Sequence, residues 1–285
     1  MARNNEERSG ARQMDAPAPP PMLDPTAADQ AFSFVTPTEF VELPSEGRYY
    51  PESHPLHNKT SVEIKYMTAK DEDILTSRAL LKKGVALDRL LRNVLVDKSI
   101  NPNDLLVGDK NAILVATRIS GYGEMYNTQL TCPVCLSTSA HDIDLSELKL
   151  TTGKQAMEEK GIREENGQFF VTLPKMKVEV GLRLTTGADE HKMIKTAEKK
   201  KKLNIPETPL TDQFRVIIQS VNGSENIGHL NEVINHMPAT DSKYLRSVYS
   251  EITPNVDMTS EFQCPVCGHE EEVSVPFTAE FFWPK

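Results

Sequence analysis

A chain of 285 residues, with 38% hydrophobic and 26% charged residues, is long enough to bury a sizeable core and is typical of one or two soluble globular domains. Its formal net charge of −9 argues against a general nucleic-acid binder, because non-specific affinity for phosphate depends on clustered Lys and Arg. The sequence contains neither an apolar run of membrane-spanning length nor the apolar core of a signal peptide, so we expect a protein that is cytosolic where it is made.

The N-terminal segment is rich in Ala, Pro and small polar residues, with the run APAPPPM at residues 16–22. A segment of this composition cannot bury enough apolar surface to fold, so we predict a disordered tail at residues 1–31. A proline-rich docking motif is the alternative interpretation of the same run.

Residues 32–150 are predicted to form a first unit of strands and helices. Residues 61–67 alternate in polarity as a strand does, after an extended segment and turn at residues 40–50. Thr68, followed by acidic residues, is typical of a capped helix start, and this helix should end near Gly84. Two more helices are predicted, over residues 87–95 and from after residue 104 to residues 121–123.

The four cysteines of the chain form two identical CPVC turns, Cys132 with Cys135 and Cys264 with Cys267. Two thiolates separated by two residues are half of a tetrahedral zinc site, and two such halves complete a closed Cys₄ site. Strand-like segments flank each turn, which predicts strand, knuckle and strand twice. Because about 128 residues separate the two pairs, we predict a split zinc ribbon with one structural Zn²⁺ per chain.

Other interpretations of the CPVC turns stay open. A thioredoxin-like redox motif should open a helix, whereas strand-like residues follow both turns. Free thiols and a rubredoxin-like iron site would use the same four residues. His141 and His269 lie near the turns, but four thiolates already fill the coordination shell, so we interpret both as surface side chains or as hydrogen-bond partners of the ligands.

After residue 150 the order of features begins again. A Leu-Pro pair precedes each CPVC turn, Leu43–Pro44 by about 88 residues and Leu173–Pro174 by about 90. We therefore predict a tandem duplication with repeats at residues 32–150 and 151–285. The expected fold class is α+β, with strands and about three helices in each half and the split zinc ribbon joining the halves.

Three charged motifs have structural explanations in this interpretation. The lysines at residues 199–202 resemble a nucleic-acid patch, but they fall at a predicted helix end, where positive charge interacts favourably with the helix dipole. The acidic pairs at residues 71–72 and 189–190 fall in the first turn of predicted helices, where capping explains them better than catalysis. Because no nucleophile elbow, phosphate-binding glycine loop or HExxH motif occurs, we expect neither an enzyme nor a small-molecule substrate.

The chain ends in an aromatic cluster, Phe281, Phe282 and Trp283. Such a cluster must be covered by other apolar groups. Packing onto the protein's own core is one interpretation, and insertion into a pocket of a partner protein is the other, because terminal aromatic side chains are good anchors.

Several short motifs carry a family resemblance through their order in the chain. They are LPSxG from Leu43, MTAxDE from Met67, GDxNAIL from Gly108, RIxxYG from Arg118, the CPVC turns and FFWP from Phe281. In this order they resemble the T4-type bacteriophage baseplate hub protein family over about residues 32–285.

The resemblance implies a hub subunit or a hub-assembly chaperone of a contractile tail. It implies other phage tail and baseplate proteins as partners, with no nucleic acid, no membrane and no catalytic residues. Such a protein would act in the host cell cytoplasm during assembly or in the tail baseplate of the virion.

A zinc-ribbon nucleic-acid-binding or transcription accessory protein is the alternative from another functional class. The residues around the knuckles argue against it, because carboxylates repel phosphate. These carboxylates are Asp142, Asp144, Glu261, Glu270, Glu271 and Glu272. A thiol oxidoreductase, the third interpretation, would need a reactive thiolate rather than a metal-bound one.

Overall fold

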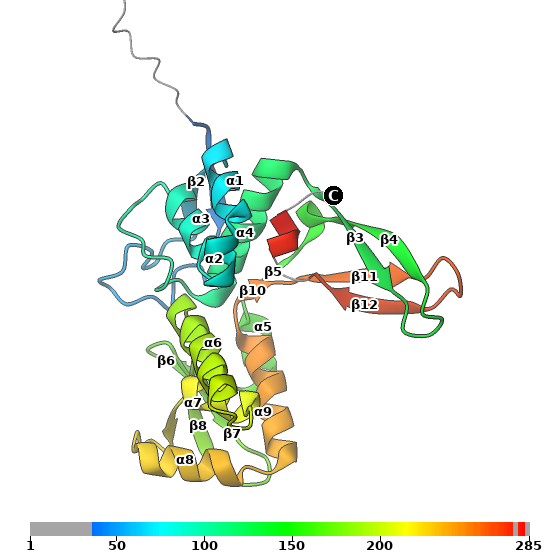
Figure 1. The fold of residues 1–285 in the computed structure, drawn as a ribbon. Coiled ribbons are helices and arrows are strands. Elements are labelled where there is room, and N and C mark those ends of the chain that lie inside the picture. Colours follow the sequence, from blue (N-terminus) through cyan, green and yellow to red (C-terminus); the bar gives the residue numbers. More distant parts are fainter. Residues whose placement is uncertain (1–35, 276–278, 283–285) are drawn as a thin grey trace, which may run out of the picture. The chain divides into compact units, whose positions relative to one another are not determined.

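Residues 36–275 and 279–282 are described by the computed structural model, and they form the expected mixture of helices and antiparallel strands (Figure 1). The predicted tail at residues 1–31 and the terminal Trp283 lie outside the described residues. Among the described helices, none combines the length and the apolar character that crossing a bilayer requires.

The first half begins with two antiparallel strands, β1 (Thr38–Glu42) and β2 (Ser61–Lys65). Alternation along β2 turns Val62 and Ile64 into the core, as its sequence pattern predicts. The long connection between the strands returns to the ladder where the Leu43 N–H donates to the Thr60 carbonyl oxygen at 2.8 Å.

The helix expected from Thr68 to Gly84 is interrupted, and the prediction of one continuous helix is wrong. It divides into α1 (Ala69–Thr76) and α2 (Arg78–Lys82), with Ser77 in an extended conformation between them. The Thr76 hydroxyl donates to the carbonyl oxygens of Glu72 and Asp73, a contact that weakens the last turn of a helix. The next helix, α3 (Ala86–Val94), buries the apolar face that its spacing predicts.

Helix α4 (Val107–Tyr122) is buried along most of its length, and it ends at Gly123 with a φ of 83°. Its N-terminal turn lies against the backbone before β10 (Asn255–Val256). A Cβ atom on Gly108 would stand 1.9 Å from the Pro254 carbonyl oxygen, so only glycine permits this contact between segments remote in sequence.

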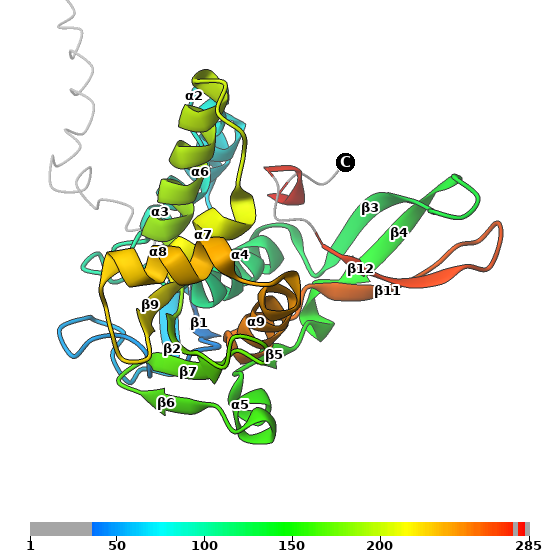
Figure 2. The same cartoon turned by 90° about the horizontal axis from the view of Figure 1, so that it is seen from below.

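Two hairpins follow the helical segments of the two halves. The first consists of β3 (Met125–Thr131) and β4 (Thr138–Asp144), and the second of β11 (Thr259–Gln263) and β12 (Glu270–Ser274). They lie side by side in both views (Figure 1, Figure 2). Strand, knuckle and strand, as predicted, is confirmed at both CPVC turns.

The second half contains a four-stranded antiparallel sheet, in the order β6-β7-β8-β9. Its strands are β6 (Arg163–Glu165), β7 (Gln168–Thr172), β8 (Glu179–Arg183) and β9 (Ile218–Val221). The helices of this half are α5 (Lys154–Lys160), α6 (Gly187–Lys202), α7 (Pro209–Ile217), α8 (Ile227–His236) and α9 (Ala239–Ile252). Short elements complete the chain: η2 (Leu145–Glu147), β5 (Leu150–Thr151) and η3 (Ala279–Phe282).

The predicted duplication would place a counterpart of the helix at residues 87–95 over residues 214–221, but α7 ends at Ile217. The last four residues form strand β9, which pairs with β8. The burial of Ile218 and Val221 in that sheet explains the difference, because a short apolar run suits a buried strand as well as a helix.

One cluster of buried apolar side chains includes residues from both halves of the sequence, among them Ile113 of α4, Phe169 of β7 and Leu245 of α9. The short pair β5–β10 also joins the halves. The two segments therefore share a core.

Candidate metal centre

The two CPVC turns have the same backbone geometry. In the first, Cys132 closes the hairpin by donating its N–H to the Ser137 carbonyl oxygen at 2.9 Å, and its own carbonyl oxygen accepts from the Leu136 N–H at 3.0 Å. In the second, Cys264 makes the corresponding bonds with His269 at 2.8 Å and with Gly268 at 2.9 Å. Each turn therefore places two thiols on one side of a hairpin tip.

The residue after the second cysteine of each turn is in the left-handed region. This residue is Leu136, with a φ of 59°, in the first turn and Gly268, with a φ of 72°, in the second. A left-handed conformation costs a residue with a Cβ roughly 1–2 kcal/mol, whereas glycine adopts it readily. The first turn thus holds a strained leucine where the second has glycine.

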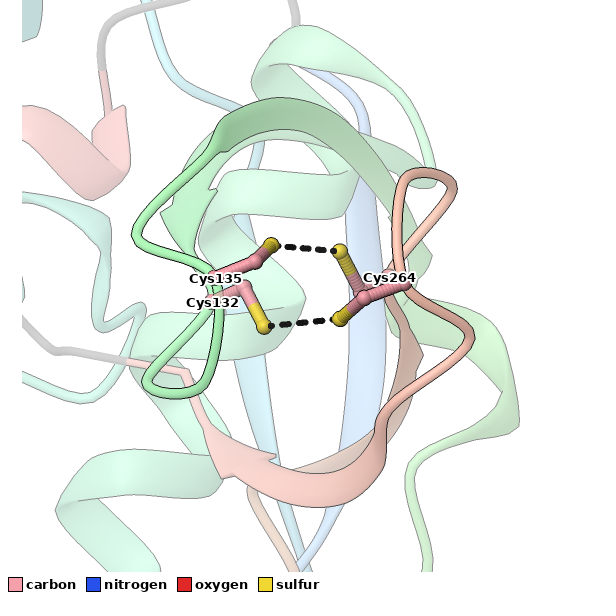
Figure 3. Close-up of side chains that lie close together, drawn as sticks. Cys132, Cys135 and Cys264 are labelled. Atoms are coloured by element: carbon pink, nitrogen blue, oxygen red, sulfur yellow. Dashed lines mark hydrogen bonds between the residues drawn. The ribbon is translucent and has the colours of Figure 1, made fainter.

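The four sulfur atoms come together between the hairpins, with all their Sγ atoms within 4.8 Å of one another (Figure 3). The Sγ atoms of Cys132 and Cys267 are 3.6 Å apart, and those of Cys135 and Cys264 are also 3.6 Å apart. Both of these pairs join one hairpin to the other. The predicted clustering of Cys132, Cys135, Cys264 and Cys267 is therefore confirmed.

These distances fit a tetrahedral metal site. Four thiolates at about 2.3 Å from a Zn²⁺ ion would have their sulfur atoms about 3.8 Å apart. They do not fit a disulfide, whose sulfur atoms are bonded at about 2.05 Å, and the four cysteines are free thiols. Four soft sulfur donors favour zinc or iron over hard cations such as Ca²⁺ and Mg²⁺.

The site combines a buried half with a half nearer to solvent. Cys132 and Cys264 are buried in a small cluster with Phe262, while Cys135 and Cys267 are exposed. A hydrogen bond from the Ser137 hydroxyl lowers the pKa of the Cys264 thiol to about 6. The lowered pKa favours the thiolate, the form in which cysteine binds a metal ion.

The neighbouring sulfur atoms oppose further deprotonation. The His269 backbone N–H lowers the pKa of the Cys267 thiol, but desolvation and hydrogen bonds with the other thiols outweigh it and raise this pKa to about 12. A bound cation would remove the mutual repulsion of the thiolates. The donor set is thus suited to hold a divalent ion.

The side chains of the two nearby histidines contact other residues of the hairpins. The Nε2 atom of His141 is 3.4 Å from the Ser260 hydroxyl, and its ring meets the Phe262 ring edge-on with centroids 5.6 Å apart. The Nε2 atom of His269 is 3.7 Å from a Glu271 carboxylate oxygen. His141 thus connects the two hairpins next to the sulfur cluster.

All three charged motifs have the structural roles that the sequence predicts. The Asp71 carboxylate accepts the Thr68 N–H at 2.9 Å at the start of α1, and the Asp189 carboxylate accepts the Thr186 N–H at 3.0 Å at the start of α6. The lysines at residues 199–202 occupy the last turn of α6. Capping and the end of a helix therefore account for these motifs.

Two of the three terminal aromatic residues are buried. Phe281 and Phe282 are both 0% exposed and belong to the shared core. The Arg118 side chain donates through Nε to the Phe281 carbonyl oxygen at 3.0 Å, and the Phe281 ring lies 5.3 Å from the Tyr126 ring, centroid to centroid. Both phenylalanines therefore pack onto the protein's own core, as the first interpretation predicts. Trp283 lies outside the described residues, so for this residue both interpretations stay open.

A cluster of charges between the two halves had no signal in the sequence. Lys110 of α4, although only 8% exposed, lies 2.9 Å from a Glu190 carboxylate oxygen of α6 and 3.4 Å from one of Asp88 in α3. The Nε2 atom of His191 is 2.7 Å from the second Asp88 oxygen. Only the tertiary arrangement of three helices brings these residues together.

Comparison with known proteins gives a family match along most of the chain. The family model described as T4 bacteriophage base plate protein matches residues 37–283. Neither the curated proteins nor the solved structures provide a match.

Proposed function

Because the chain belongs to the T4 bacteriophage base plate protein family, we propose that it is a hub subunit or hub-assembly chaperone, which acts by binding other tail proteins and catalyses no reaction. The observation that carries the proposal is the family match, which spans nearly all of the described residues. Assembly would take place in the host cell cytoplasm and deliver the protein, or the hub it helps to build, to the tail baseplate.

The four thiols are proposed to hold one structural Zn²⁺ ion per chain. The sulfur separations of 3.6 Å support this assignment, as does a donor set without carboxylate or imidazole. A site closed by four protein ligands has no open position for a substrate, so its contribution would be to stability.

The metal would fix the relation of the two hairpins. Each hairpin is a two-stranded sheet of its own, and such a pair of strands is marginally stable when isolated. An ion bound by both tips would hold them in one arrangement before any partner arrives. Preorganisation of this kind reduces the entropy lost on binding.

The two halves are proposed to be products of a tandem duplication. Three features support this proposal: the matching helix starts at Thr68 and Thr186, the matching CPVC turns, and a segment that pairs beside β2 and beside β8. In the second half the third strand is β9, paired with β8, and in the first half an isolated bridge between Ile64 and Leu95 takes its place beside β2. An experimental structure in which residues 40–148 do not superpose on residues 170–280 would exclude the duplication.

Nucleic-acid binding by the hairpins is disfavoured by their charge. The segments 125–144 and 259–274 contain six carboxylates and neither Lys nor Arg. These carboxylates would repel a phosphate backbone from both hairpins.

A phage with this gene disrupted tests the proposed function. We expect infected cells to accumulate tail intermediates without complete baseplates, seen by electron microscopy, and complementation by the full chain to restore them. A tagged full chain should also co-purify with tail proteins, identified by mass spectrometry. Normal baseplates in the disrupted phage, or tight capture of nucleic acid without any tail protein, would contradict the proposal.

A further inference from the structure

The molecule carries a basic groove that the metal site does not use. It lies between α1 to α3 and α6 and has a volume of about 770 Å³. Five cations line it, Lys70, Lys83, Arg89, Arg92 and Lys195, and none of them forms an ion pair with another described residue.

The carboxylates of the groove do not neutralise these cations. Asp88 already lies 3.4 Å from Lys110 and 2.7 Å from His191. Glu198 is the other acidic residue of the lining, against five cations. The lining also includes Ile194, whose side chain is 53% exposed. In a chain of net charge −9, the groove is thus a positive surface with an exposed apolar group.

The paired hairpins have the complementary character. We call residues 125–144 and 259–274 together the arm. Its six carboxylates have no Lys or Arg within the arm, and Glu261 stands directly opposite Glu272 in the β11–β12 ladder. Like charges at opposite positions of a ladder destabilise it unless a cation lies between or beside them.

The tip of the arm is apolar. Val134 is 65% exposed, Leu136 is 75% exposed and Val266 is 70% exposed, and all three belong to the two CPVC turns. An apolar tip flanked by carboxylates matches an exposed isoleucine flanked by cations. This is the usual anatomy of a protein interface, in which an apolar centre is surrounded by a charged rim.

We propose that the arm of one copy of this chain docks in the groove between α3 and α6 of a second copy. The arm and the groove are different surfaces, so the contact is head to tail, and repetition of it closes a ring or extends a filament. The inference rests on the proposed function in that it names a second copy as one partner in assembly. Attraction between the opposite charges would speed the encounter and weaken with added salt.

Sedimentation velocity on the zinc-loaded full chain tests the contact. The wild-type protein should form species heavier than the monomer at low salt, and these should dissociate as the salt concentration rises. Two double variants remove one surface each: Glu261→Lys with Glu272→Lys in the arm, and Arg89→Glu with Lys195→Glu in the groove. Each variant alone should associate at least about tenfold more weakly than the wild type.

A mixture of the two variants provides the most direct test. Each mixed pair contains one intact arm and one intact groove, and its reversed arm and reversed groove also carry opposite charges, so the mixture should recover the association that neither variant shows alone. Matched controls change the same charges elsewhere on exposed sites: Glu207→Lys with Glu225→Lys, and Lys243→Glu with Arg246→Glu. These controls should associate as the wild type does, and circular dichroism with zinc content should show that every variant is folded.

Several results would overturn the inference. One is a wild-type chain that stays monomeric at low salt, and another is association that persists in both double variants. A third is association that a nuclease abolishes, because this would make the groove a nucleic-acid site. A monomeric chain that still co-purifies with tail proteins would overturn this inference and leave the proposed function standing. Loss of baseplates in the gene-disrupted phage is measured separately and does not depend on self-association.

Discussion

Asp109 and Asp241 make the same contact in the two halves of the chain. Each is the third residue of its helix, α4 or α9, and each accepts the N–H of the residue that follows a Leu-Pro pair. The distance is 3.0 Å from the Ser45 nitrogen to Asp109 and 2.8 Å from the Lys175 nitrogen to Asp241. Both aspartates are completely buried.

Replacement of either aspartate by Asn should destabilise the protein. The amide offers one acceptor oxygen in place of two, so one donor of the turn is left facing an N–H₂ group. A buried hydrogen-bonding group left without its partner costs on the order of 1–3 kcal/mol. Urea unfolding should show this loss for Asp109→Asn and for Asp241→Asn, while Asp73→Asn, at an exposed site in α1, should change stability by less than about 0.5 kcal/mol. A loss in one half alone would contradict the equivalence of the two contacts.

The strained leucine of the first CPVC turn gives the second prediction. Leu136→Gly should stabilise the zinc-loaded protein by up to about 1 kcal/mol, because glycine relieves the left-handed strain at a side chain that is 75% exposed. The matched change Gly268→Ala should destabilise by about 1–2 kcal/mol. Thermal unfolding with excess zinc measures both. Stabilisation by Gly268→Ala would show that the two turns do not share one geometry.

Variants of the terminal aromatic residues distinguish packing in the core from binding to a partner protein. Phe281→Ala should lower the free energy of unfolding by about 3–5 kcal/mol, because it opens a cavity in the shared core. Trp283→Ala is the matched test of the partner interpretation. Lost capture of tail proteins at an unchanged melting temperature would support an anchor at Trp283, whereas a lowered melting temperature would assign Trp283 to the core as well.

The pH dependence of stability should include a contribution from Asp189. Burial raises the pKa of this carboxyl, but the Arg183 guanidinium at 2.6 and 2.7 Å and the Thr186 N–H outweigh burial and hold the pKa below its usual 3.8. The unfolded chain therefore takes up the proton first as the pH falls. The stabilisation is complete well above pH 3.8 and is lost as the pH falls through the folded-state pKa.

Comparison of the wild type with Asp189→Asn measures this contribution. The difference in melting temperature between the two should be largest near neutral pH and should shrink as the pH falls below about 4. A difference that stays constant from neutral pH to acid would mean that Arg183 does not stabilise the charged form.

Local patterns in the sequence predict the hairpins, the CPVC turns and the helix starts at Thr68 and Thr186, because each depends on neighbouring residues. The strand at residues 218–221 could not be predicted, since a short apolar run fits a helix end as well as a buried strand. The break at Ser77 follows a helix turn in which the Thr76 hydroxyl bonds to the carbonyl oxygens of Glu72 and Asp73, a detail that the residue pattern does not reveal. The cluster of Lys110, Asp88 and Glu190 depends on tertiary packing alone.

The approach of the four sulfur atoms was predictable because each CPVC turn lies between strand-like segments and supplies two of the four thiolates of a Cys₄ metal site. The groove between α3 and α6 was not, because its cations are scattered from Lys70 to Lys195 and only the packed helices bring them to one surface. The burial of Phe281 likewise required the position of Tyr126 and Arg118.

Native mass spectrometry of the full chain, purified without chelator, tests most directly the claim that one metal ion joins the two hairpins. The account predicts one zinc ion per chain and no zinc-loaded species for a variant with Cys135→Ser and Cys264→Ser, which removes one thiolate from each hairpin. Because ligand thiols must release their protons, acidification should remove the zinc from the wild type. Two metal ions per chain, or a wild-type chain that carries none, would contradict the single site shared by Cys132, Cys135, Cys264 and Cys267.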